Sequence, residues 1–278
     1  MTTVQIRDVS LFMKVIGEGY PLLIMHGGPG ADHSTMLPLQ RCADQFSLIF
    51  YDHRCNGRSL GADVTTMTWE NLTADAEALR QTLGFDKWAV LGHSFGGMVA
   101  LEYALRYPQN LSHLLLLDTC GDAWWVQHNA PNVLAKRGYN AAAEQAARRF
   151  FNGQLEPNEV LPAMLKFGRA YYYNSSFLRY VRGVSSGFRV KMQPEALIFG
   201  FSQLLKGWTV MERLNEIEVP TLVLAGRDDF QFPPEHQVIL ADRIPNAQLE
   251  IIECAGHNAP MERPDEVTEI VRRFMATE

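Results

Sequence analysis

The pentapeptide Gly92-His93-Ser94-Phe95-Gly96 lies between an apolar run, Trp88–Leu91, and a stretch with helical periodicity. In that setting the pattern G-x-S-x-G predicts a sharp strand–turn–helix that lifts the serine hydroxyl above the carboxyl edge of a sheet. Glycines flank such a serine because a Cβ there would collide with the neighbouring strand or helix. The N-terminus of the new helix also directs free N–H groups toward developing negative charge. The motif and its context therefore predict that Ser94 is a nucleophile.

Short apolar runs alternate with helical patterns along most of the chain. Each run is too short for a helix, and most are bounded by turn residues, so we expect buried strands. The predicted strands are Leu22–Met25, Leu48–Tyr51, Trp88–Leu91, Leu114–Leu117, Leu222–Ala225 and Leu249–Ile252. An antiparallel hairpin is expected ahead of them, over Val4–Ile16. This alternation predicts an α/β fold with a mostly parallel central sheet that helices cover on both faces.

Three helices can be placed from the sequence. Thr68 is a suitable N-cap for a helix whose apolar face runs over Leu72–Leu83. A second helix should begin at the proposed nucleophile and end before Pro108, and the last should cover Asp265–Met275.

The regular alternation is interrupted between Ala123 and Lys206. No strand pattern occurs there, and the segment contains many helix formers and aromatic residues. We therefore predict a core domain from residues 1–122 and 207–278, with a helical cap inserted over residues 123–206. Most of the aromatics should hold the cap helices together, and a few should line a substrate pocket.

The composition excludes several classes of function. The chain has 278 residues, is 47% hydrophobic and carries a formal net charge of −6. Its Lys and Arg residues are scattered, which argues against nucleic acid or an anionic membrane as a partner. A small-molecule substrate is the expected partner, and a monomer and a homo-oligomer are both compatible with the sequence.

The cysteines and the N-terminus bear on location. The cysteines are far apart, without the spacing of a zinc site or a disulfide framework, and are Cys42, Cys55, Cys120 and Cys254. The first residues, Met1–Ser10, lack the features of a signal peptide, and no apolar run is long enough to cross a bilayer. We expect a cytoplasmic protein that needs no metal or other cofactor.

A glycine-rich loop, His26-Gly27-Gly28-Pro29-Gly30, follows the first buried strand. Glycines allow backbone to approach a substrate oxygen closely. We predict an oxyanion hole formed by the N–H groups of Gly28 and Phe95, because Pro29 has no N–H to donate.

The general base should be His257, which follows the last predicted strand in a loop that can reach Ser94. His93 adjoins the serine but cannot bend back onto its hydroxyl. Three aspartates follow strands at the same edge, namely Asp118, Asp228 and Asp229. The chain order Ser…Asp…His is compatible with each of them.

Taken together, these motifs resemble those of the α/β-hydrolase superfamily over nearly the whole chain. In that superfamily the acid usually follows a G-x-x-D pattern, which falls on Asp229. The resemblance therefore implies a triad of Ser94, His257 and Asp229. The segment Tyr51–Ser59 also resembles a superfamily motif, with Cys55 in place of a glycine, and should brace the site.

The resemblance leaves several substrates open. The HGGPG loop is similar to that of prolyl aminopeptidases, also called proline iminopeptidases, which use carboxylates to bind an amino terminus. The candidates for that role are Glu144, Glu156, Glu159 and Glu195, and none lies in a recognisable amine-binding motif. The elbow looks more like those of esterases and lactonases, which favours hydrolysis of an ester or lactone. Prolyl aminopeptidase is the alternative, and carbon–carbon hydrolysis and non-catalytic ligand binding are weaker ones.

Overall fold

A computed structural model describes residues 2–175, 178 and 190–276. These residues form an eight-stranded sheet with the strand order β1-β2-β4-β3-β5-β6-β7-β8. The pairs β1–β2 and β2–β4 are antiparallel, and all other neighbours are parallel. The strands are β1 (Thr2–Ile6), β2 (Val9–Ile16), β3 (Tyr20–Met25), β4 (Phe46–Tyr51), β5 (Trp88–His93), β6 (Leu111–Leu117), β7 (Thr221–Gly226) and β8 (Ala247–Ile252). The mostly parallel sheet that the sequence predicts is thus confirmed.

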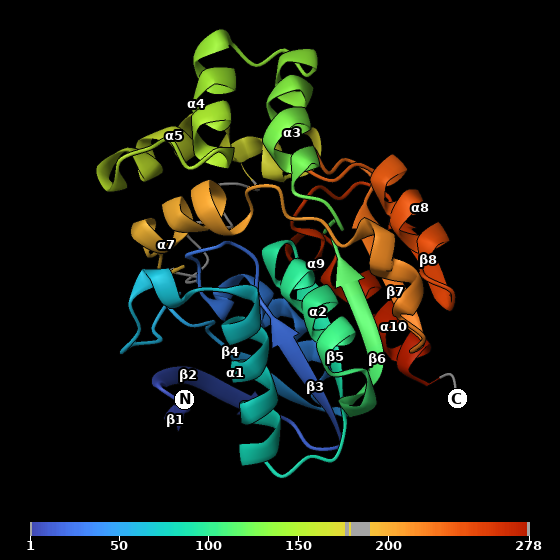
Figure 1. Ribbon diagram of the computed structural model, residues 1–278. Coiled ribbons are helices and arrows are strands. Elements are labelled where there is room, and N and C mark those ends of the chain that lie inside the picture. The colour runs from blue at the N-terminus through green and yellow to red at the C-terminus, as the bar shows by residue number, and fades with distance from the viewer. Residues whose placement is uncertain (1, 176–177, 179–189, 277–278) are drawn as a thin grey trace.

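Helices cover both faces of this sheet (Figure 1). The α-helices are α1 (Trp69–Thr82), α2 (Phe95–Arg106), α3 (Trp124–Lys136), α4 (Ala141–Phe151), α5 (Val160–Phe167), α7 (Pro194–Phe199), α8 (Pro234–Arg243), α9 (Ala259–Glu262) and α10 (Pro264–Met275). The remaining helical segments, which are not α-helical, are η1 (His33–Cys42), η2 (Val64–Thr66), η3 (Pro108–Asn110), η4 (Pro157–Glu159), η5 (Gly168–Tyr171), η6 (Tyr173–Ser175), η7 (Gly200–Leu204) and η8 (Met211–Glu216). The Thr68 side chain caps α1 by accepting a hydrogen bond from the Asn71 N–H.

The strand β5 illustrates how the core is divided. Trp88 and Val90 point into one hydrophobic cluster, which contains residues of α1 and α2. Ala89 and Leu91 point into the other, which contains residues of η1 and α10. Because successive side chains of a strand alternate between faces, a strand covered on both sides is apolar throughout. This explains why the predicted inner strands, such as Leu22–Met25 and Trp88–Leu91, are continuous apolar runs.

The helices α3, α4 and α5 lie above the carboxyl edge of the sheet (Figure 1). Between Ala123 and Lys206 the described residues form helices and no strand. Aromatic side chains pack these helices together, with ring centroids of Phe150 and Phe151 at 5.4 and 5.8 Å from that of Phe167. We call residues 123–206 the cap, and their status as a separate subdomain stays a prediction.

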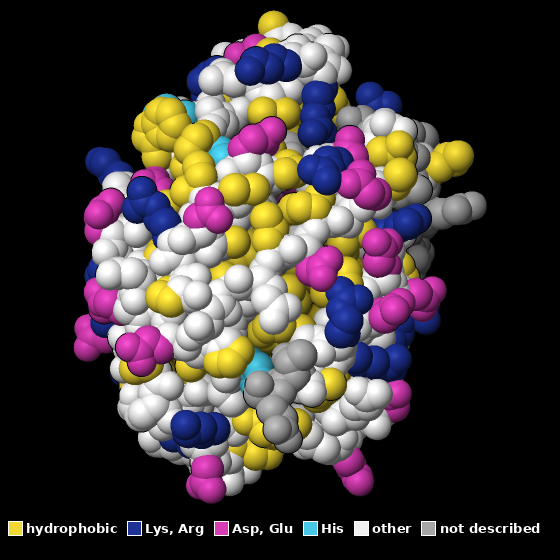
Figure 2. All heavy atoms as spheres, turned by 90° about the vertical axis from the view of Figure 1, so that its right-hand side faces the viewer, with side chains coloured by type: hydrophobic (Ala, Val, Ile, Leu, Met, Phe, Trp, Pro, Cys, Tyr) yellow, Lys and Arg dark blue, Asp and Glu magenta, His cyan; other side chains and the backbone are white. Residues whose placement is uncertain are grey.

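Charges of both signs are interspersed over the face shown in Figure 2, where neither sign forms a continuous patch. Among the described residues, none of the helices is both long enough and apolar enough to span a bilayer.

Candidate active site

The turn that carries Ser94 is strained and tightly held. Ser94 adopts φ 54° and ψ −122° between β5 and α2, a backbone conformation that costs about 1–3 kcal/mol for a residue with a side chain. Its N–H donates to the Leu117 carbonyl at 3.0 Å, and its carbonyl accepts from the Thr119 hydroxyl at 2.7 Å. A Cβ at Gly96 would collide with the carbonyl oxygen of Met25, the last residue of β3, and with that of His26. Neighbouring strands and the glycine together keep the serine in this conformation.

Three side chains from separate loops meet at this turn. His257 Nε2 lies 3.0 Å from Ser94 Oγ, and His257 Nδ1 lies 2.8 Å from Asp229 Oδ2. Asp229 follows β7, and its Oδ1 accepts the Gln231 N–H at 2.7 Å, which orients the carboxylate. The arrangement can transfer the serine proton to the imidazole while the carboxylate holds the tautomer.

The other two aspartates lie at the same edge but have other hydrogen-bond partners. Asp118 follows β6 and is fully buried, and its Oδ1 accepts the Gly226 N–H at 2.8 Å. Burial, with the nearby Asp229 carboxylate, raises the pKa of Asp118 well above its usual value. Asp228 is only partly buried, and its peptide N–H donates to the Ala255 carbonyl. Of the three candidates, Asp229 is the one hydrogen-bonded to His257 among the described residues.

The glycine-rich loop passes beside the serine turn. A Cβ on Gly27 would lie 3.1 Å from Ser94 Cβ and 2.7 Å from His93 Nδ1. Gly28 follows with φ +121°, a conformation that side chains disfavour. Phe95 is the first residue of α2, so its N–H has no acceptor within the helix. The assignment of Gly28 and Phe95 as oxyanion donors stays a prediction, and the loop's position beside Ser94 is compatible with it.

His93 has a role that sequence reasoning missed. Its Nε2 lies 2.8 Å from the His257 carbonyl oxygen, and the two ring centroids are 4.9 Å apart. Burial, together with the neighbouring His257, lowers the pKa of His93 to about 3, so the ring is neutral. The neutral ring can carry its proton on Nε2 and donate it to the His257 carbonyl oxygen. The side chain cannot act on Ser94, but it positions the backbone of the proposed base. The contact joins residues 164 positions apart in the chain, and no local sequence pattern predicts it.

The predicted brace around Tyr51–Ser59 is a buried polar network. Asp52 accepts the N–H groups of His33 and Arg58, at 2.9 and 2.8 Å. The Asn56 side chain accepts the Gly30 N–H, and thereby attaches the glycine-rich loop to this segment. The left-handed conformation expected for a glycine occurs at Cys55, with φ 63°. These hydrogen bonds orient the glycine-rich loop, and none of them involves Ser94.

The surroundings of the proposed base are aromatic. The rings of Tyr171 and Phe232 have centroids 5.4 and 5.7 Å from that of His257. Ser94 is 7% exposed and His257 is 2% exposed. Such an enclosed apolar site excludes water and strengthens the electrostatic interactions within it. Among the described residues, no group of three or more His, Cys, Asp or Glu side chains could hold a metal ion.

A family model described as the alpha/beta hydrolase fold matches residues 20–264. The chain belongs to this family. The protein is thus a hydrolase of the α/β fold, and the family resemblance found in the sequence is confirmed.

Individual relatives of this hydrolase carry different names. A proline iminopeptidase of Thermoplasma volcanium is 25% identical, over 98% of this chain and 95% of that protein. The crystal structure of proline iminopeptidase from Mycobacterium smegmatis aligns with a TM-score of 0.78 at 24% identity, covering 99% and 97% of the two chains. A thermophilic esterase from Thermogutta terrifontis aligns with a TM-score of 0.71 at 25% identity, covering 99% and 98%. The α/β-hydrolase fold is common to all of these proteins.

Proposed function

We propose that the protein hydrolyses carboxylic esters or lactones through an acyl-enzyme on Ser94. The observation that carries this proposal is the hydrogen-bonded chain from Ser94 through His257 to Asp229, beside the aromatic rings of Tyr171 and Phe232. A neutral acyl group suits these buried, aromatic surroundings because burying a charge without a partner is costly.

The reaction follows from the positions of these groups. His257 Nε2 accepts the Ser94 proton as Oγ attacks the substrate carbonyl, and the Gly28 and Phe95 N–H groups stabilise the oxyanion. The imidazolium then protonates the leaving alcohol oxygen, which departs. Water, deprotonated by His257, releases the acid and restores Ser94. Asp229 stabilises the imidazolium in both halves of the reaction, and His93 keeps the backbone of His257 in place.

The glutamates considered for amine binding support an ester or lactone over an amino-terminal substrate. Glu144 is paired with Arg148 at 2.9 Å, and Glu159 with Arg149 at 2.6 Å. Glu156 and Glu195 are exposed. None of the four has a hydrogen bond to Ser94 or His257 among the described residues.

Prolyl aminopeptidase is the second candidate because relatives named proline iminopeptidase match almost the whole chain. A peptide bond can be cleaved by the same serine, base and acid. The two candidates differ in whether the substrate brings a charged amine to the site.

Steady-state rates on p-nitrophenyl butyrate, a simple lactone and prolyl-p-nitroanilide separate the candidates, with Ser94→Ala as the control. We expect turnover of the ester or lactone that Ser94→Ala abolishes. A kcat/KM that is highest for the prolyl substrate would establish the aminopeptidase instead. Turnover of none of the three, at rates above the Ser94→Ala background, would favour a carbon–carbon hydrolase or a binding protein.

A further inference from the structure

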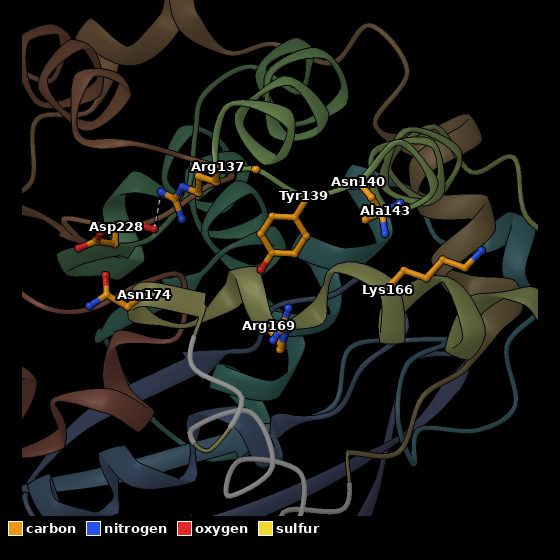
Figure 3. Close-up of a pocket in the computed structure, with 9 residues that line it drawn as sticks. Arg137, Tyr139, Asn140, Ala143, Lys166, Arg169, Asn174 and Asp228 are labelled. Carbon is orange, nitrogen blue, oxygen red and sulfur yellow. Dashed lines mark hydrogen bonds between the residues drawn. The ribbon is translucent and has the colours of Figure 1, made fainter.

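A cavity of about 650 Å³ lies between the cap and the turn that follows β7. Its walls come from the α3–α4 connection, from α4, α5, η5 and η6, and from Asp228. Figure 3 shows Tyr139 among these lining residues, with Arg137 and Arg169 on different sides of its ring. Ser94, His257 and Asp229 are not among the residues that line the cavity, so it is separate from the candidate active site.

The two arginines of this cavity differ from the others in the protein. Every other arginine in the described part of the chain forms an ion pair with an Asp or Glu side chain. Arg137 instead donates to the backbone carbonyl of Asp228 at 2.9 Å, and Arg169 has no carboxylate partner among those residues. In a chain with a net charge of −6, two unpaired guanidinium groups therefore line one cavity. A guanidinium group presents a planar set of donors that matches carboxylate and phosphate oxygens.

The Tyr139 hydroxyl is a second, independent observation. Its oxygen is buried and has no hydrogen-bond partner. A polar group that gives up water without gaining a partner costs about 1–3 kcal/mol, so such groups are rare unless a ligand or water satisfies them. The hydroxyl can donate to an oxyanion held by the arginines.

Asp228 is the carboxylate among the described residues that line the cavity, and its side chain forms no direct ion pair with Arg137 or Arg169. Its backbone carbonyl, rather than its side chain, receives the Arg137 hydrogen bond. Figure 3 shows its carboxylate directed away from Tyr139. Asp228 therefore interacts with Arg137 only at longer range, and Arg169 has no carboxylate partner among the described residues.

We propose that this cavity binds a small organic anion, whose carboxylate or phosphate group is held by Arg137 and Arg169 and accepts a hydrogen bond from Tyr139. The volume is in the range of cavities that enclose small molecules, about 300–1,000 Å³. The site lies outside the catalytic chain of hydrogen bonds, so its occupancy does not require hydrolysis.

Isothermal titration of the full-length protein with malate, and separately with inorganic phosphate, tests the proposal at constant ionic strength. We expect saturable binding of at least one of them, with the tighter ligand showing whether the site prefers a carboxylate or a phosphate. Arg137→Met and Arg169→Met should each weaken that binding by about tenfold or more, and Tyr139→Phe should weaken it several-fold. Ser94→Ala should bind as the wild type does, which separates this result from the proposed hydrolysis.

The matched control is Arg213→Met, because Arg213 is also exposed and has its own partner, Glu216, at 2.8 Å. This variant removes one positive charge from a residue that does not line the cavity, and it should leave the affinity for the anion unchanged. Circular dichroism and thermal melts establish that each variant is folded. The proposal is wrong if neither anion binds below about 10 mM, if folded Arg137→Met and Arg169→Met retain the wild-type affinity, or if Arg213→Met weakens binding equally.

Discussion

The carboxyl edge of the sheet and the cap above it hold their polar groups in different ways. At the edge, Asp229 and His257 are almost completely buried, and each is hydrogen-bonded to a specific partner. In the cap, aromatic rings provide the packing, while Arg137 and Arg169 have no carboxylate partner among the described residues. Hydrogen bonds within the edge fix its atoms for chemistry. The cap residues lie outside the hydrogen-bonded chain of Ser94, His257 and Asp229, so changes there should affect stability or ligand choice more than the chemical step.

The largest effect on rate is expected at the edge, from Ser94→Ala. Loss of the nucleophile should lower kcat by a factor on the order of 10⁴–10⁶, because residues of a triad act as a unit. Stability should change little, since the backbone bonds of Ser94 to Leu117 and Thr119 do not involve its hydroxyl. Ester turnover and thermal unfolding of the same preparation measure both effects.

Phe150→Ala in the cap should have the opposite pattern of effects, with a large loss of stability and a small loss of rate. Phe150 is 3% exposed and packs against three other phenylalanine rings. Its truncation should reduce the free energy of unfolding by about 3–5 kcal/mol. We expect kcat of the folded fraction to fall less than tenfold. A loss of rate as large as that of Ser94→Ala would show that the cap positions the chemical groups directly.

The comparison of Asp229→Asn with Asp118→Asn separates two buried carboxyl groups at the same edge. Asp229→Asn should lower kcat by about 10⁴, because an amide cannot hold the histidine tautomer or stabilise its charge. Asp118→Asn should change kcat less than tenfold, because the raised pKa of Asp118 favours a neutral acid, which an amide resembles. The reverse order of effects, measured with p-nitrophenyl butyrate, would assign the acid to Asp118.

His93 offers a smaller effect at the same edge. His93→Phe removes the hydrogen bond to the His257 carbonyl and should lower kcat/KM by about 10–100-fold. His93→Gln can place an amide donor near the same point and should recover most of the loss. Equal activity of the two variants, at equal thermal stability, would show that His93 acts through packing and not through its hydrogen bond.

The edge could be predicted from sequence further than the cap could. The fold followed from apolar runs that are buried on both sides, and Thr68 marked the start of α1 because its capping signal is local. Ser94, His257 and Asp229 follow β5, β8 and β7, so parallel strands bring them to one edge, but strand order alone could not separate Asp229 from Asp118. The His93 contact and the cap cavity depend on how loops and helices pack in three dimensions, and periodicity does not encode that packing.

The smallest expected effect concerns acid stability, and it also distinguishes the edge from the cap. His93 has a pKa of about 3 when folded, against an ordinary value of 6.5, because it is buried. Between those two pH values the unfolded chain binds more protons than the folded one, so stability falls as the pH is lowered from 6.5 toward 3. Burial also lowers the pKa values of His26 and His53 at the same edge, in the same direction. His93→Gln removes one such group, and we expect the decrease in Tm between about pH 7 and pH 5 to be smaller than in the wild type. The replacement His128→Gln in the cap, where the side chain is exposed, should leave that decrease unchanged. An unchanged decrease in His93→Gln would mean that His93 does not stay neutral in the folded protein over this range.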